Sequence, residues 1–191
     1  MPILLLSGGI ESATLLHERC GSRDLRALFI DYGQRAARAE RATAIALCTR
    51  TGTPLTTVAL KGLGALAPAA AWTPHVPLAA RNLLAVSLAA NHALALRVRG
   101  VLLGLQRDDR AHGEGAAPFI TALADTLAAL GLELETPYRD LSKAQVVARG
   151  RALGIDYTAT YSCLLGRRTP CGRCPQCRAR TQALADDSGA A

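Results

Sequence analysis

The change of pattern within the first sixteen residues constrains the fold more than any other feature of the sequence. An apolar run over residues 2–6 ends in Ser7-Gly8-Gly9, and a helical pattern with Leu15 and Leu16 on its apolar face follows at once. This order predicts a buried strand, a tight turn and a helix N-terminus. Glycine lets the backbone approach a ligand, and the first N–H groups of a helix lack internal partners. Since the helix dipole also favours negative charge there, the stretch predicts an anion-binding turn.

The turn differs from two common phosphate-binding turns. It lacks the Gly-x-x-x-x-Gly-Lys-Ser/Thr pattern of a P-loop, and it lacks the glycine spacing of a dinucleotide-binding fingerprint. Ser7 and Ser12 add hydroxyl donors to the backbone groups. On local evidence alone, an ordinary strand–helix turn is an equally good interpretation.

The remainder of the chain alternates strand-like and helix-like segments. The expected strands are residues 25–31, 55–60, 101–104 and 132–136, and the expected helices are residues 35–51, 78–99, 118–130 and 142–153. Such alternation predicts an α/β fold with a doubly wound, parallel, five-stranded sheet. Residues 61–77 are rich in Ala, Pro and Gly and are expected to form a loop over the site. Ligands of such sheets bind beyond the carboxyl ends of the strands.

Four of the six cysteines lie close together near the end of the chain. Cys163, Cys171, Cys174 and Cys177 have the spacing C-x₇-C-x₂-C-x₂-C. Four thiolates suit a tetrahedral Zn²⁺ ion, and with four protein ligands that ion would be structural because no position is open to water. An iron–sulfur cluster is an alternative that the spacing alone does not exclude. We therefore expect an α/β domain that carries the anion-binding turn at residues 1–158 and a small zinc-binding segment and tail at residues 159–191.

Charge and hydropathy limit the cellular compartment and the binding partners that we expect for this protein. No stretch approaches the roughly 20 apolar residues of a membrane span, and the early glycine turn interrupts the first apolar run too soon for a secretory signal. We expect a cytoplasmic protein with reduced thiols and no membrane contact. The net charge of +7 suits a nucleic-acid surface, but one Trp, four Tyr and two Phe leave few rings for base stacking. We favour a solvated arginine-rich face.

Several motifs together resemble a known family. Ser7-Gly8-Gly9-x-Glu11-Ser12 resembles the pyrophosphate loop of the ATP pyrophosphatase (PP-loop) superfamily, with Glu11 where that superfamily usually has Asp. The further motifs, in order, are Asp31-Tyr32-Gly33-Gln34-Arg35 with Glu40, Val76-Pro77, Arg81-Asn82, Glu135-Thr136-Pro137, Leu141-Ser142-Lys143, Tyr161-Ser162-Cys163, the three later cysteines and Arg180. This order resembles the 7-cyano-7-deazaguanine synthase (QueC) family nearly end to end.

The resemblance implies a reaction. ATP adenylates the carboxylate of 7-carboxy-7-deazaguanine and releases pyrophosphate, and ammonia then displaces AMP to form an amide. A second adenylation, on the amide oxygen, and loss of AMP leave the nitrile. The implied cofactors are ATP, Mg²⁺ and Zn²⁺, and the implied assembly is a homodimer that binds a 7-deazaguanine-type small molecule.

The resemblance also implies site residues. The residues implied in ATP binding are Leu6, Ser7, Gly8, Gly9, Ile10, Glu11, Ser12, Asp31 and Arg35. The implied catalytic residues are Arg81, Asp109, Glu114 and Lys143, with Asn82 also lining the site. The four clustered cysteines match the zinc ligands.

The chain departs from the family in one loop. Residues 112–116 read His-Gly-Glu-Gly-Ala where the family has Tyr-Pro-Asp-Cys-Arg, so Glu114 alone retains the acid. Because this loop is expected to shape the nucleobase pocket, a QueC-like ligase that joins deazaguanine to a protein amine, as in a defence system, is an alternative. A PP-loop tRNA-modifying enzyme would need a reactive cysteine near the loop, whereas Cys20 and Cys48 resemble core residues. A nucleotide-binding module without catalysis is a further alternative.

Overall fold

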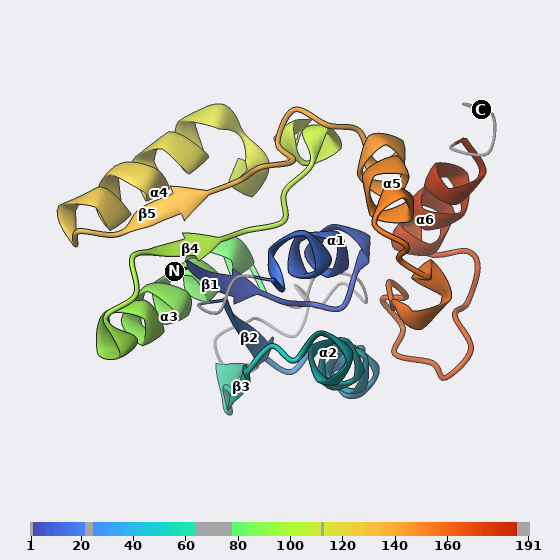
Figure 1. Cartoon of the computed structure of the whole chain (residues 1–191), viewed down its shortest axis with the longest axis horizontal. Coiled ribbons are helices and arrows are strands. Elements are labelled where there is room, and N and C mark those ends of the chain that lie inside the picture. The colour runs from blue at the N-terminus through green and yellow to red at the C-terminus, as the bar shows by residue number, and fades with distance from the viewer. Residues whose placement is uncertain (1, 22–24, 64–77, 112, 187–191) are drawn as a thin grey trace.

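A five-stranded parallel sheet forms the centre of the molecule (Figure 1). The computed structural model describes residues 2–21, 25–63, 78–111 and 113–186. The strands are β1 (Pro2–Leu5), β2 (Arg26–Asp31), β3 (Leu55–Ala59), β4 (Gly100–Leu102) and β5 (Glu133–Glu135), and their order in the sheet is β3-β2-β1-β4-β5. The order reverses between β1 and β4, which confirms the doubly wound α/β fold expected from the sequence.

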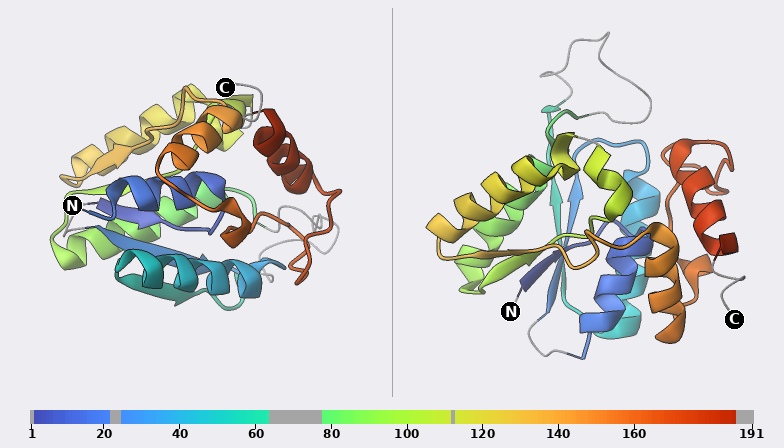
Figure 2. Two further views of the ribbon diagram at one scale, coloured as in Figure 1. Left: turned by 45° about the vertical axis from the view of Figure 1, so that its right-hand side comes forward. Right: turned by 90° about the horizontal axis from the view of Figure 1, so that it is seen from above.

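Helices cover both faces of this sheet. They are α1 (Ile10–Arg19), α2 (Ala37–Thr51), α3 (Arg81–Leu96), α4 (Ala117–Ala129), α5 (Lys143–Ala152) and α6 (Pro175–Asp186). Helices α1, α2 and α5 lie on one side and α3 and α4 on the other, as two views of the ribbon show (Figures 1 and 2). The predicted helices and strands correspond to observed elements, with ends that differ by at most three residues.

Each face of the sheet has its own hydrophobic core. Successive strand residues point to opposite faces, so Leu4 packs with α1, α2 and α5 while the adjacent Ile3 packs with α3 and α4. Both side chains are 0% exposed. Burial on both faces explains why β1 reads as a continuous apolar run, and it fixes the turn that follows β1 on a rigid base.

The end of the chain folds back toward the first turn. After the short 3₁₀ turn Tyr157–Ala159, the chain passes the β1–α1 turn and leads to α6, which packs beside α5 (Figure 2). Helix α6 was not predicted, although Pro175 at its first position is a usual start signal. Most of the loop expected at residues 61–77 lies outside the described residues. No helix within the described ranges is long and apolar enough to cross a membrane.

Candidate active site

The turn after β1 presents an uncapped helix N-terminus. Gly8 has a φ of 80°, and a Cβ atom added there would lie 2.9 Å from Thr43 Cγ2 on α2. Gly9 is the N-cap of α1 and makes no side-chain capping bond. Ser12 Oγ donates to the Gly9 carbonyl oxygen at 3.3 Å and lies 3.3 Å from Ser7 Oγ. The turn therefore offers two hydroxyls and the N–H groups of the first helical turn to an anion.

The same turn lies at the point where the strand order reverses. Gly104, just after β4, approaches α1 so closely that a Cβ atom there would lie 3.2 Å from Glu11 Cβ and 3.3 Å from Ser12 N. The end of β4 and the start of α1 thus border one site. Open α/β sheets bind ligands at this position.

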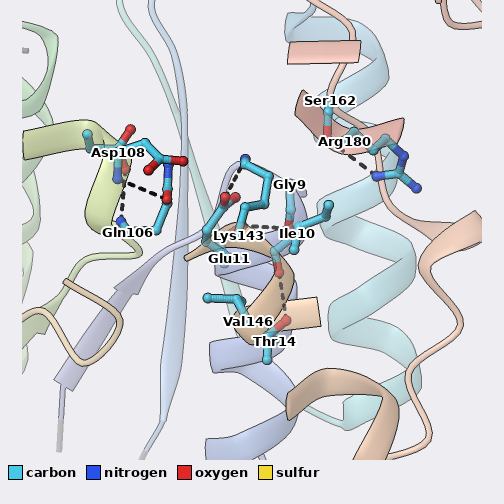
Figure 3. A network of polar contacts seen from close by, with 12 residues as sticks. Gly9, Ile10, Glu11, Thr14, Gln106, Asp108, Lys143, Val146, Ser162 and Arg180 are labelled. Carbon is cyan, nitrogen blue, oxygen red and sulfur yellow. Dashed lines mark hydrogen bonds and ion pairs between the residues drawn. The ribbon is translucent and has the colours of Figure 1, made fainter. Parts of the chain in front are cut away.

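A lysine extends into the site from α5. Lys143 Nζ forms an ion pair with Glu11 Oε1, and the two side chains are 14% and 15% exposed (Figure 3). Lys143 is the first residue of α5, whose start is fixed by a capping box between Ser142 and Gln145. Among the described residues, Lys143 is the partner found for the buried Glu11 Oε1. Lys143 is one of two lysines in the chain, and the capping box at the start of α5 fixes its position.

A second group of side chains follows β2. Asp31 Oδ1 accepts the Gly33 N–H at 3.0 Å. The buried Gln34 side chain accepts the Tyr32 N–H at 2.9 Å and donates to Glu40 Oε2 at 2.9 Å. These bonds hold the loop after β2 in a defined shape beside the anion-binding turn.

Arg81 belongs to this second group. It is the first residue of α3, and it hydrogen bonds with the Tyr32 side chain. Burial raises the pKa of Glu40, and the nearby positive charge of Arg81 opposes that rise. Arg81 is therefore brought to the end of β2. The Arg35 side chain, by contrast, is exposed, and its carbonyl oxygen lies so close to Gly166 that a Cβ atom there would overlap it.

The loop after β4 forms two 3₁₀ turns, Arg107–Ala111 and Gly113–Gly115. Asp109 Oδ2 accepts the Gln106 N–H at 2.9 Å, and Gln106 Oε1 accepts the Asp108 N–H at 3.1 Å. Gln106 and Asp108 lie across from Glu11 in the close view (Figure 3). The Arg107 N–H donates to the Leu141 carbonyl oxygen at 2.8 Å, so this loop borders the site beside the chain that leads into α5.

Glu114 connects this loop to α3. Its Oε1 accepts the Leu83 N–H at 3.0 Å, in the first turn of a helix whose own N-cap residue, Ala80, makes no side-chain bond. Glu114 thus caps α3 from a distance and lies next to the helix turn that carries Arg81. Its neighbour His112 lies outside the described residues.

The four clustered cysteines form one thiolate group. Their Sγ atoms all lie within 4.8 Å of one another, and Cys171 Sγ lies 3.9 Å from Cys177 Sγ. Four thiolates at about 2.3 Å around a tetrahedral Zn²⁺ lie about 3.8 Å apart, so the geometry fits such an ion. Backbone N–H groups of Arg173 and Cys174 lower the pKa of the Cys171 thiol to about 6, which favours its thiolate form, whereas burial raises the pKa of the Cys177 thiol to about 12. The donor set also suits an iron–sulfur cluster.

Sequence reasoning missed two contacts around the anion-binding turn. The Tyr161 N–H donates to the Gly8 carbonyl oxygen at 2.9 Å, and Arg180 on α6 binds the chain just before Tyr161, donating to Thr160 Oγ1 at 2.6 Å. These partners are separated by up to 153 positions in the chain. No local pattern in the sequence could have indicated them, although the cysteines that follow Tyr161 hinted at an ordered segment.

Comparison with known proteins identifies the family. A model of the family described as queuosine biosynthesis protein QueC matches residues 1–188. The chain belongs to the QueC family. It is 36% identical over 205 residues to the 7-cyano-7-deazaguanine synthase of Thiobacillus denitrificans, covering 94% of this chain and 91% of the relative. It is 30% identical to 7-cyano-7-deazaguanine synthase 1 of Sulfurisphaera tokodaii, covering 95% of this chain and 91% of the relative.

Solved structures show the same fold. The U34-tRNA thiolase NcsA from Methanococcus maripaludis, determined with its [4Fe-4S] cluster, has a TM-score of 0.58 at 16% identity and is similar over 97% of this chain and 64% of its own. The NMN synthetase of Francisella tularensis has a TM-score of 0.57 at 15% identity, over 89% of this chain and 69% of its own. At these identities the likeness concerns the fold alone. The likeness confirms the predicted α/β fold, and the QueC match confirms the prediction of an ATP-dependent ligase.

Proposed function

We propose that this QueC protein converts 7-carboxy-7-deazaguanine to 7-cyano-7-deazaguanine with ATP and ammonia. The observation that carries the proposal is the anion-binding turn of Ser7 to Ser12 at the reversal point of the sheet, with Lys143 beside it. The names of the curated QueC relatives support the product, and the turn supports the use of ATP.

In this proposal the turn holds the phosphates of ATP. The N–H groups at the start of α1 and the hydroxyls of Ser7 and Ser12 bind the β- and γ-phosphate oxygens that leave as pyrophosphate. Glu11 is proposed to hold Mg²⁺ that comes with the nucleotide, because its buried carboxylate lies at the same helix start. Asp31 and Arg35, after β2, are proposed to contact the rest of the nucleotide.

Adenylation is needed because hydroxide is a poor leaving group from a carboxylate. A substrate carboxylate oxygen attacks the α-phosphorus and pyrophosphate leaves. Ammonia then attacks the acyl carbon, and AMP leaves with that oxygen. Lys143 is proposed to stabilise the charge that develops on the phosphates, and Arg81 is proposed to stabilise the leaving groups from the other side. The amide oxygen attacks a second ATP in the same way, and loss of AMP and a proton leaves the nitrile.

Two acids are proposed to recognise the deazaguanine. Asp109 shapes the turn after β4 through Gln106, and Glu114 lies where this loop meets α3. A carboxylate can accept bonds from a ring N–H and an exocyclic NH₂ group together, which matches the guanine-like edge. In Glu114, Oε2 would serve the base while Oε1 keeps its bond to the Leu83 N–H.

The thiolate group is proposed to hold a structural Zn²⁺ ion through Cys163, Cys171, Cys174 and Cys177. Bound there, the ion would cross-link the chain before α6 to the first turn of that helix. It would supply no catalytic chemistry, because the four thiolates complete its coordination.

A QueC-like ligase with an altered acceptor is the second candidate function. The observation that favours it is the engagement of Glu114 with α3, which leaves residues 113–116 as a short turn of small side chains around one acid. Such a turn leaves more room than the family's Tyr-Pro-Asp-Cys-Arg stretch. An amine on a protein could then replace ammonia as the nucleophile.

Mass spectrometry of the products decides between these functions. The protein is incubated with ATP, Mg²⁺, 7-carboxy-7-deazaguanine and ammonia, with an incubation lacking ATP as control. Formation of 7-cyano-7-deazaguanine with AMP supports the proposal. An acyl-adenylate that accumulates despite excess ammonia would favour the altered acceptor, and no consumption of ATP would contradict both.

A further inference from the structure

The chain that leads into the four cysteines touches the turn after β1 directly. The Tyr161 N–H donates to the Gly8 carbonyl oxygen at 2.9 Å, from a position two residues before Cys163. On its other side Gly8 faces Thr43 of α2, with no room for a Cβ atom. The turn is therefore held between α2 and the chain that leads into the cysteine segment.

Arg180 fixes the shape of that chain. Its guanidinium donates to the Tyr157 carbonyl oxygen, to Thr160 Oγ1 at 2.6 Å and to Ser162 Oγ at 3.4 Å. Thr160 Oγ1 in turn donates to the Tyr157 carbonyl oxygen at 2.8 Å. The guanidinium fork thus spans the residues on both sides of Tyr161, as the close view shows for Ser162 (Figure 3). The fork therefore adds to the local bonds of this segment, such as the Thr160 N–H to the Tyr157 carbonyl oxygen at 3.0 Å and the Tyr161 hydroxyl to the Arg167 carbonyl oxygen at 2.8 Å, in holding the Tyr161 N–H toward Gly8.

The placement of Arg180 depends on the cysteines. Arg180 lies one helical turn after Cys177 on α6, which begins at Pro175 between two of the thiolates. Cys174 and Cys177 are buried against Tyr161 in one cluster. Binding of a metal ion by the thiolates would therefore fix α6, and α6 would fix Arg180.

We propose that Arg180 is a positioning residue that couples the cysteine segment to the ATP turn. It does not touch the reacting atoms. It holds residues 157–162 so that the Tyr161 N–H anchors Gly8, and the anchored turn then binds phosphate without further ordering. A second connection runs parallel, because the Tyr157 hydroxyl lies 2.7 Å from Thr14 Oγ1 on α1.

The test uses three variants of the full chain. Arg180→Met removes the fork, and Arg180→Lys keeps the charge but loses the forked donors. Arg178→Met removes the same charge from an exposed position on the same helix and is the matched control. The measurements are metal content, melting temperature, the dissociation constant for MgATP, and amide hydrogen exchange of the Gly8–Ser12 turn and of Tyr161 without nucleotide.

We expect Arg180→Met to keep its metal and to bind MgATP about tenfold more weakly, with faster exchange at Tyr161 and in the turn. Arg180→Lys should show a smaller loss, and Arg178→Met should match the parent within about twofold. Parent-like affinity and exchange in Arg180→Met would overturn the proposal. If Arg180→Met does not fold, Arg180→Lys decides, and parent-like values there would overturn it.

The inference rests on the proposed function in one respect, since it assumes that ATP binds at the turn. If the parent protein does not bind MgATP, the proposed function fails. Exchange at Tyr161 and in the turn would still report whether Arg180 anchors the turn, because that measurement requires no nucleotide. Failure of the coupling and failure of the proposed function are therefore distinguishable.

Discussion

The loops after β1 and after β4 border the same site but are held in different ways. The β1 turn is held by backbone: Gly8 packs against α2, its carbonyl oxygen binds the Tyr161 N–H, and α1 starts directly after it. The β4 loop depends on side chains as well: besides backbone bonds such as the Arg107 N–H to the Leu141 carbonyl oxygen at 2.8 Å, Asp109 binds the Gln106 N–H and Glu114 binds the Leu83 N–H.

This difference suggests which of the two loops can change more easily through substitution. Backbone groups are the same for every residue type, so a turn built from them is altered by substitutions only when a side chain does not fit. A loop whose shape depends partly on two carboxylates is altered when either of those residues is replaced. The chain departs from the family in the second loop, at residues 112–116, while it keeps Ser7-Gly8-Gly9 in the first.

The largest effect is expected from Gly8→Val. A β-branched side chain cannot easily adopt a φ of 80°, and its Cβ atom would lie 2.9 Å from Thr43 Cγ2. We expect the affinity for MgATP to fall about a hundredfold or more, equivalent to about 2.8 kcal/mol. Calorimetric titration measures this, with Gly21→Ala as a control because nothing lies within 4 Å of a Cβ atom there. Unchanged affinity in Gly8→Val would show that phosphate binds elsewhere.

Lys143→Met should reduce turnover, and it should also lower the melting temperature because it leaves the buried Glu11 carboxylate without its partner. The substitution removes the cation that pairs with Glu11 at the start of α1. We expect kcat for AMP formation to fall about a hundredfold, as when a preorganised charge-stabilising group is lost. Steady-state kinetics check this against Lys61→Met, which removes the other lysine of the chain from an exposed position. A change in KM alone would reduce Lys143 to a binding residue.

Glu114→Gln tests the role of the loop after β4. Glutamine keeps an Oε1 atom to accept the Leu83 N–H, so α3 should remain capped while the negative charge is lost. We expect the KM for 7-carboxy-7-deazaguanine to rise about tenfold and the affinity for MgATP to stay within about twofold of the parent. If neither value changes, Glu114 serves only as a helix cap and the altered acceptor becomes the better hypothesis.

The last expected effect concerns the metal and is measured on the stability of the fold. Elemental analysis of protein purified under reducing conditions should find one zinc per chain, and iron in its place would contradict the zinc proposal. Cys174→Ser removes one buried ligand, and a loss of about 2 kcal/mol would lower the melting temperature by roughly 4–8 °C. Cys48→Ser, a buried thiol outside the cluster, should keep the zinc.

Local sequence patterns predicted most of the fold but few of the contacts within the candidate site. Apolar runs and the glycine turn indicated all five strands and the helix start at residue 10, because these features depend on neighbouring residues. The ion pair of Glu11 with Lys143, the capping of α3 by Glu114 and the bond from Tyr161 to Gly8 join residues far apart in the chain. The resemblance to QueC named several of these residues, but the partner of each became visible only in the folded structure.

The most direct test of adenylation at the β1 turn traces the carboxylate oxygens of the substrate into the nucleotide products. 7-Carboxy-7-deazaguanine labelled with ¹⁸O in both carboxylate oxygens is converted with ATP and ammonia, and the nucleotide products are analysed by mass spectrometry. Because each adenylation places a substrate oxygen on the α-phosphorus, the account predicts two AMP molecules per nitrile, each with one ¹⁸O atom, and unlabelled pyrophosphate. ADP with labelled inorganic phosphate would contradict the claim that the β1 turn is a pyrophosphate loop, and unlabelled AMP would contradict adenylation of the carboxylate.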